Sequence, residues 1–323
     1  MTRTLILVVA AALVLCERSA TGQSADKTSA PPRPMSLPEA IEFVRPSVVQ
    51  IAASVDLATA GGQFPGRPAA IGTGFMVNED GYVVTARHVI EFFRSIQAPG
   101  KHLWVGVGTP NLDDFKIGKG SISLTGNFGL TEAAVAAEDE LHDVVILKMK
   151  QNPFFGQMGT FVSGPGQKID YLHKAAILSP DRPRDGELVA ASGYPLNKMA
   201  LVTTSGSVAS GWDYEMKQVH PPNAPPGFMI PESSDSYLVD MHVNHGNSGG
   251  PVYTIKDGGV IGICVSFNEA PVEHGNNAPS PQADPLYFNS GLGNVVPIRY
   301  AVELLKKNNL KWKEMKSIAV HPK

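Results

Sequence analysis

Short apolar runs separated by glycine-, proline- and asparagine-rich segments recur along most of the chain. Nine of them are interpreted as β-strands: residues 47–53, 74–77, 82–85, 103–107, 144–149, 187–191, 205–209, 237–241 and 259–265. Each run has the length of a strand and is bounded by turn residues. No long amphipathic helices alternate with these runs, so the pattern predicts an all-β barrel or sandwich and disfavours a parallel α/β fold.

Two helices are predicted, one at each end of this strand-rich region. Ser36 and Glu39 have the spacing of a capping box, so a short helix should begin after Ser36 and stop before Pro46. Near the C-terminus, apolar residues recur at the spacing of one helix face: Ile298, Ala301, Val302 and Leu305. Two proline-rich segments, residues 219–231 and 268–285, are predicted to be surface loops.

The first 22 residues have the features of an export signal. Arg3 precedes an apolar run over residues 5–16 that is too short to span a bilayer, and small residues follow at Ala20 and Gly22. We therefore expect cleavage after Gly22 and a periplasmic or secreted chain without stable membrane insertion. Two alternatives stay open, a retained membrane anchor and lipid attachment at Cys16.

The remaining chain is expected to form a flexible leader over residues 23–35, one domain over residues 36–310, and a basic, solvated tail over residues 311–323. Apolar residues make up 43% of the chain and charged residues 18%, which permits a large core and argues against general disorder. The net charge of −3 lacks the basic excess of a nucleic-acid-binding protein, so no nucleic-acid partner is expected.

The cysteine content excludes a disulfide framework. The chain has two cysteines, Cys16 and Cys264, and removal of the signal leaves Cys264 alone. Because Cys264 lies within the apolar run 260–265, a buried and unreactive thiol is the favoured interpretation.

The sequence Gly-Asn-Ser-Gly-Gly-Pro over residues 246–251 indicates a serine nucleophile. A serine hydroxyl attacks when a base takes its proton and donors hold the oxyanion that forms. Small residues around Ser248 let the backbone bend, so that the N–H groups of Gly246 and Ser248 point to one place. The same letters fit the nucleophile elbow of α/β-hydrolases, but Gly-Gly-Pro after Ser248 is a poor helix start. A glycine-rich turn without chemistry is the other alternative.

A histidine and an aspartate precede this serine in suitable local contexts. Residues 72–77 and 82–89 predict a hairpin whose second strand ends at His88, which would hold the imidazole rigidly. Asp143 comes directly before an apolar strand, so its carboxylate should be partly buried and should need a donor such as an imidazole N–H. Taken singly, a surface histidine and a strand-capping aspartate are the favoured interpretations. Together with Ser248 they follow the order His, Asp, Ser of chymotrypsin-type proteases.

With these residues the chain resembles trypsin-like serine proteases of the high-temperature-requirement (HtrA/Deg) branch. The resemblance lies in residues 72–89, 142–148, 193–195, 202–208, 240–252 and 294–298. It implies an all-β fold of two six-stranded antiparallel β-barrels, with the active site between them. It also implies His88 as general base, Asp143 as the residue that orients it, and Ser248 as nucleophile. The N–H groups of Gly246 and Ser248 would form the oxyanion hole.

The chain also departs from this branch. The residues after Ser248 are mostly needed to complete the second barrel, so no PDZ domain is expected. Insertions are expected near residues 109–134 and 212–235. His245 stands where the branch often has proline, beside the oxyanion-hole peptide. The oligomeric state is left open.

The resemblance implies protein or peptide substrates. His242, six positions before the nucleophile, is expected at the base of the primary substrate pocket, where the lack of an aspartate removes selection for Lys or Arg. Cleavage after uncharged side chains is therefore expected. Protonated, His242 could accept an acidic side chain; alternatively, its ring turns away into the barrel.

The sequence permits three kinds of function. An active endopeptidase for quality control or processing is favoured over a secreted binding or chaperone-like module, because no catalytic residue is missing. A metal site at His242 and His245 is disfavoured, since two histidines three residues apart in a strand and turn do not share one face. Neither a metal nor a cofactor is expected.

Overall fold

The computed structural model describes residues 33–55, 68–97, 100–107, 115–118, 121–124, 129–164, 167–197, 200–218, 229–271 and 287–315. From Pro34 onward the chain forms one compact unit. The predicted signal, residues 1–22, and most of the predicted leader lie outside the described residues.

Six antiparallel strands close the first barrel in the order β1-β2-β3-β8-β7-β4. These are β1 (Val48–Val55), β2 (Ala69–Met76), β3 (Tyr82–Ala86), β4 (Lys101–Val107), β7 (Gly129–Asp139) and β8 (Val144–Met149). All eight residues of β1 are buried, and large apolar side chains such as Phe75 and Leu147 fill the interior. The first barrel is therefore a packed core rather than a channel.

Six further strands close the second barrel, because β17 pairs with both β12 and β18. They are β12 (Leu188–Gly193), β13 (Val202–Ser210), β16 (Tyr237–Asp240), β17 (Pro251–Thr254), β18 (Val260–Pro271) and β19 (Tyr287–Pro297). Two short strands, β11 (Ile177–Leu178) and β20 (Lys313–Glu314), extend the sheet from β18. The prediction of two six-stranded barrels is confirmed, and all nine predicted strands are present.

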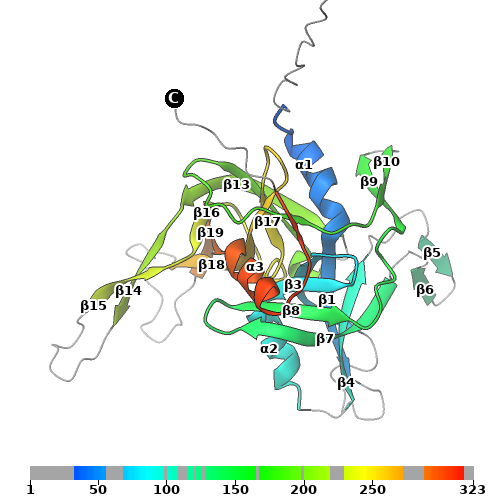
Figure 1. Cartoon of the computed structure of the whole chain (residues 1–323). Coiled ribbons are helices and arrows are strands. Elements are labelled where there is room, and N and C mark those ends of the chain that lie inside the picture. The colour runs from blue at the N-terminus through cyan, green and yellow to red at the C-terminus, as the bar shows by residue number, and fades with distance from the viewer. Residues whose placement is uncertain are drawn as a thin grey trace, which may run out of the picture. The chain divides into compact units, whose positions relative to one another are not determined.

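Three hairpins lie outside the barrels. They are β5 (Phe115–Gly118) with β6 (Ser121–Leu124), β9 (Met158–Gly164) with β10 (Gln167–Leu172), and β14 (Asp213–Gln218) with β15 (Met229–Ser234). The first and the last fall in the two predicted insertions, and β14–β15 projects from the second barrel (Figure 1). The predicted loop 268–285 needs correction at its start, since residues 268–271 belong to β18, and likewise residues 229–231 of the other predicted loop belong to β15.

Both predicted helices are present. The helix α1 (Leu37–Val44) begins with the expected capping box, in which the Ser36 N–H donates to Glu39 Oε2 at 2.8 Å, and one 3₁₀ turn, η1 (Arg45–Ser47), follows it. The helix α3 (Ile298–Lys307) contacts β7 and β8 of the first barrel and β18 and β19 of the second. Its predicted apolar face is buried: Ile298, Ala301, Val302 and Leu305. Burial of this face by both barrels explains why α3 is a stable part of the fold.

A third helix, α2 (Arg87–Ser95), corrects the prediction that His88 ends a strand. The strand β3 stops at Ala86, and His88 lies in the first turn of α2. Val89 and Ile90 of this helix are buried in the core, and an ion pair between Arg87 and Glu91, 2.8 Å apart, bridges one turn on its surface. Apolar burial on one face and an i,i+4 pair on the other both favour a helix here.

The start of the predicted solvated tail is attached to the fold. Strand β20 pairs with β11, and the Met315 N–H donates to the carbonyl of Leu178 at 2.7 Å. Asn78 also donates from its side chain to the carbonyl of Lys311 at 2.8 Å. Residues 316–323 lie outside the described part of the chain.

Candidate active site

An aspartate and a histidine are joined at the edge of the first barrel. Asp143 lies in the turn between β7 and β8 with φ +55°, a left-handed conformation that aspartate adopts more readily than most residues. Its Oδ2 lies 2.6 Å from His88 Nδ1, and its Oδ1 accepts the His88 backbone N–H at 2.8 Å. Because a carboxylate only accepts, Nδ1 carries the proton, and Nε2 of the neutral ring is left as an acceptor.

The loop that carries Ser248 packs against the first barrel. Gly249 has φ +83°, and a Cβ there would lie 1.9 Å from Thr85 Oγ1 and 2.2 Å from the Thr73 carbonyl oxygen. Only glycine combines this dihedral angle with so close an approach. The Thr73 N–H also donates to the Ser248 carbonyl at 2.9 Å. Ser248 is thereby held at the junction of the two barrels.

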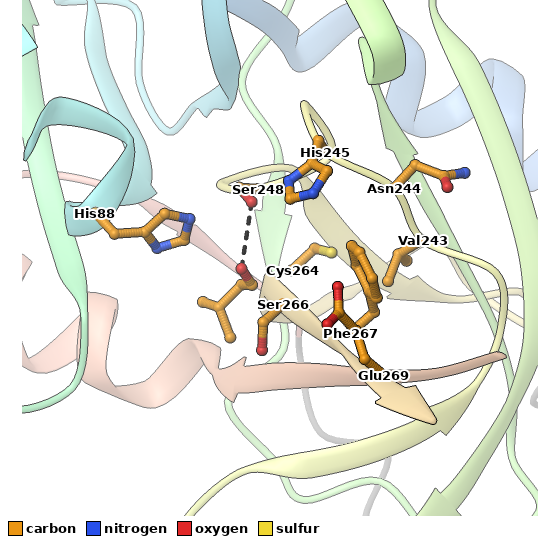
Figure 2. A pocket seen from close by; sticks show the side chains of 10 residues that line it. His88, Val243, Asn244, His245, Ser248, Cys264, Ser266, Phe267 and Glu269 are labelled. Atoms are coloured by element: carbon orange, nitrogen blue, oxygen red, sulfur yellow. Dashed lines mark hydrogen bonds between the residues drawn. The ribbon is translucent and has the colours of Figure 1, made fainter. Parts of the chain in front are cut away.

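The Ser248 hydroxyl donates to the Val265 carbonyl at 3.2 Å, the bond drawn in Figure 2. The His88 ring points from α2 toward Ser248 in the same view, and the two side chains line one cavity. No hydrogen bond joins Ser248 to His88 in the described structure. Hydrogen bonds between a nucleophile and its base are often long without substrate and tighten in the complex.

Two backbone N–H groups beside Ser248 are available to a ligand. Neither Gly246 nor Ser248 donates its N–H to any described residue. The carbonyl of His245 accepts the Leu196 N–H at 2.8 Å. Because a trans peptide directs its N–H opposite to its C=O, the N–H of Gly246 points away from Leu196. A pair of unpaired N–H groups in one loop can stabilise a developing negative charge.

The cavity shared by His88 and Ser248 has a volume of about 260 Å³. Its other lining residues are Val243, Asn244, His245, Cys264, Val265, Ser266, Phe267 and Glu269. Phe267 and Val243 supply apolar wall, and Glu269 lines the cavity from the same strand as Phe267 (Figure 2). Ligand pockets usually span about 300–1,000 Å³, so this cavity suits a peptide side chain better than a large cofactor.

His242, expected at the base of the primary substrate pocket, does not line this cavity. His242 is exposed, is not among the residues that line the cavity, and has its ring beside Gly291. Its neighbours Met241 and Val243 are buried, so alternation along the extended chain turns His242 to the outside. His245 lines the cavity instead, with its ring edge-on to Phe267 at 5.3 Å between centroids. The described residues contain no cluster of three or more groups suited to a metal ion.

Cys264 lines the cavity but is buried and unpaired with another cysteine. Burial raises the pKa of its thiol to about 12, because the thiolate would lose its solvation. The expectation of a buried, inert thiol therefore fits the described environment. The sequence analysis did not identify Phe267 or Glu269 as cavity residues. Both lie a few residues after the apolar run that contains Cys264.

The two closed barrels and the His–Asp pair beside a Gly-Asn-Ser-Gly-Gly loop define a chymotrypsin-type architecture. The chain belongs to the family of trypsin-like peptidase domains, which matches residues 72–263 and so includes His88, Asp143 and Ser248.

Curated relatives are named as serine proteases. The chain is 28% identical over 202 residues to a probable periplasmic serine endoprotease DegP-like of Chlamydia pneumoniae, covering 62% of this chain and 30% of the relative. It is 26% identical over 197 residues to serine protease HTRA1 of Xenopus laevis, covering 61% and 31%. The chain thus spans under a third of the length of these relatives. Within the described residues, no helix has both the length and the apolar character needed to cross a membrane.

Proposed function

We propose that this protein is a serine endopeptidase that hydrolyses peptide bonds through an acyl-enzyme. The observation that carries the proposal is the Asp143–His88 pair, whose ring faces the same cavity as the Ser248 hydroxyl. Membership of the trypsin-like peptidase family supports it. Protein or peptide chains are the proposed substrates.

In the proposed mechanism, His88 Nε2 takes the proton of the Ser248 hydroxyl as Oγ attacks the scissile carbonyl carbon. To do so, the hydroxyl exchanges the Val265 carbonyl for the imidazole as its acceptor. Asp143 holds the imidazole in the tautomer that accepts at Nε2 and stabilises the imidazolium that forms. The N–H groups of Gly246 and Ser248 hold the oxyanion.

Collapse of the tetrahedral intermediate breaks the C–N bond, and the departing amine takes the proton from the His88 imidazolium. A water molecule, deprotonated by the same imidazole, then hydrolyses the Ser248 ester and restores the hydroxyl. The apolar wall formed by Val243 and Phe267 supports a preference for uncharged side chains at the cleaved position.

The proposed setting is outside the cytoplasm, in protein quality control or processing. Two observations support it: the signal-like composition of residues 1–22 and the periplasmic designation of several relatives. Recovery of the mature chain in an osmotic-shock fraction, with Gln23 as its first residue, is the expected outcome. Recovery of an intact Met1 in the cytoplasm would contradict this part of the proposal.

The decisive experiment is active-site labelling with a fluorophosphonate, which reacts only with an activated serine. The wild-type chain should be labelled and should digest an unfolded protein, and Ser248→Ala should do neither. Ser266→Ala is a suitable control, because this hydroxyl also lines the cavity but is not the proposed nucleophile. Equal labelling of wild type and Ser248→Ala would refute the assignment. A folded wild type that reacts with neither reagent would favour the binding-module alternative.

A further inference from the structure

One buried threonine of the first barrel is bonded to the segments that surround Ser248. Thr73 lies in β2 and is fully buried. Its Oγ1 donates to the Gly246 carbonyl at 2.6 Å and accepts the Tyr194 N–H at 3.0 Å. Its own N–H donates to the Ser248 carbonyl. A single residue therefore binds three main-chain groups of two loops that belong to the second barrel.

These bonds restrain the two peptide groups on either side of Gly246. The carbonyl of Gly246 is bound by Thr73, and the preceding carbonyl, that of His245, is bound by the Leu196 N–H. Gly246 has φ +97°, and glycine has no side chain that would restrict rotation about this position. The orientation of its N–H therefore depends on the hydrogen bonds on either side.

The partner loop is itself constrained. Leu196 has φ +52°, a left-handed conformation that costs a non-glycine residue about 1–2 kcal/mol. Its side chain is largely exposed, so burial of the leucine does not repay this cost. The Leu196 N–H donates to the His245 carbonyl, and the Thr73 hydroxyl accepts the Tyr194 N–H, so hydrogen bonds at both positions hold this loop in its strained conformation. Strain of this kind is found where a conformation serves a site.

We propose that Thr73 is a positioning residue of the active site, whose hydroxyl holds the Gly246 peptide with its N–H aimed at the oxyanion. This inference rests on the proposed function and deepens it. A hydroxyl can donate and accept at once, and both capacities are used here. Valine has nearly the same shape but would leave a buried C=O and a buried N–H unpaired. The bond from the Leu196 N–H to the His245 carbonyl and that from the Asn247 N–H to the Asn244 carbonyl remain. Loss of the Thr73 bonds therefore leaves Gly246 less restrained and weakens the preorganisation of the oxyanion hole.

The test compares Thr73→Val with Thr73→Ser, which keeps the hydroxyl. Steady-state kinetics on a fluorogenic peptide selected with the wild-type chain give kcat and KM separately. Affinity for a peptide aldehyde, whose tetrahedral adduct places an oxyanion in the same hole, gives a second readout. Thr131→Val is the matched control, because Thr131 is also buried in the first barrel and its hydroxyl donates to the Gln151 carbonyl at 3.1 Å.

We expect Thr73→Val to lower kcat by about 10- to 100-fold with KM changed by less than about threefold, since the oxyanion forms only after the substrate is bound. Aldehyde affinity should fall by a similar factor. Thr73→Ser should restore both quantities to within about threefold of wild type. Thr131→Val should lower the melting temperature but leave kcat within about twofold.

Three results would overturn the inference: unchanged kcat and aldehyde affinity in folded Thr73→Val, an equal loss in Thr73→Ser, or a rise in KM with unchanged aldehyde affinity. If Thr73→Val fails to fold, Thr73→Ala and Thr73→Ser carry the same comparison, because they differ only in the hydroxyl. The parallel fluorophosphonate assay separates the two proposals. A labelled wild type with unaffected Thr73 variants refutes the positioning role alone, whereas an unlabelled wild type refutes the proposed function and this inference with it.

Discussion

Replacement of Asp143 by asparagine probes the proposed mechanism most directly, since it alters protons but little of the shape. The carboxylate accepts from two donors of His88, the backbone N–H at 2.8 Å and the ring Nδ1–H at 2.6 Å. An amide offers one acceptor and one donor. If its oxygen keeps the backbone bond, its NH₂ faces Nδ1, which must then accept. The proton of the neutral ring moves to Nε2, where it prevents acceptance of the Ser248 proton.

The size of the effect follows from the two bonds. The reversed amide, which would keep the useful tautomer, sets NH₂ against the His88 N–H and leaves these donors without an acceptor, at a cost of about 1–3 kcal/mol. The useful tautomer is thereby depleted by roughly 10- to 100-fold. Loss of the negative charge beside the imidazolium also removes stabilisation of the transition state. This contribution is about 1 kcal/mol, because the Asp143 side chain is 33% exposed and solvent screens its charge. Together these effects amount to about 2–4 kcal/mol, so at 1.36 kcal/mol per factor of ten kcat should fall by about 10²- to 10³-fold.

Folding should survive this substitution. Asparagine adopts the left-handed conformation of Asp143 readily, and the bond from the Arg87 N–H to the Asp143 carbonyl involves only backbone atoms. Glu140→Gln is the matched control, since it removes the same charge from an 80% exposed side chain in the same turn. Initial rates of peptide hydrolysis give kcat, and thermal melting reports whether each variant is folded. A folded Asp143→Asn variant with more than a third of wild-type kcat, or an equal loss in Glu140→Gln, would refute the reasoning.

Two further predictions concern the surroundings of the site. Burial raises the pKa of Cys264 to about 12, so roughly one thiol in 10⁴ is ionised at pH 8. A thiol-reactive disulfide should therefore modify the native chain only after denaturant is added. Modification within minutes without denaturant would contradict this. Gly249→Ala should lower the free energy of unfolding by several kcal/mol or prevent folding, because the added Cβ overlaps backbone atoms and the Thr85 side chain. Gly186→Ala is the control: Gly186 has φ +79° but open space around it, so this substitution should cost only about 1–2 kcal/mol. Similar melting temperatures for the two variants would show that the Ser248 loop is not held as described.

Local patterns in the sequence predicted nine of the twelve barrel strands and both terminal helices. The nine predicted strands and both terminal helices are present, because apolar runs between turn residues, a capping box and an i, i+3, i+4, i+7 face act over a few residues each. Three barrel strands, β7, β17 and β19, were not predicted. In β19 the residues Asn289, Gly291, Gly293 and Asn294 look like turn residues. Pairing with β16 and β18 on both sides makes it a strand.

The sequence likewise predicted some features of the candidate site and missed others. The order of His88, Asp143 and Ser248, each beside a recognisable strand or glycine-rich turn, was sufficient to predict that they would meet. The sequence could not show that His88 begins a helix, because that helix depends on burial of Val89 and Ile90 against the barrel. Nor could counting back from Ser248 locate the cavity wall, since alternation in the folded chain turns His242 outward.

Only the tertiary structure revealed Thr73. Its partners Tyr194 and Gly246 lie 121 and 173 residues further along the chain, and no local pattern relates a threonine to groups so distant. Hydrogen bonds between neighbouring strands fix each barrel separately. Packing of the two barrels against each other then brings Thr73 of the first barrel to the loops of the second. Local motifs in the sequence therefore determined which residues could react, whereas tertiary packing determined which groups hold those residues in place.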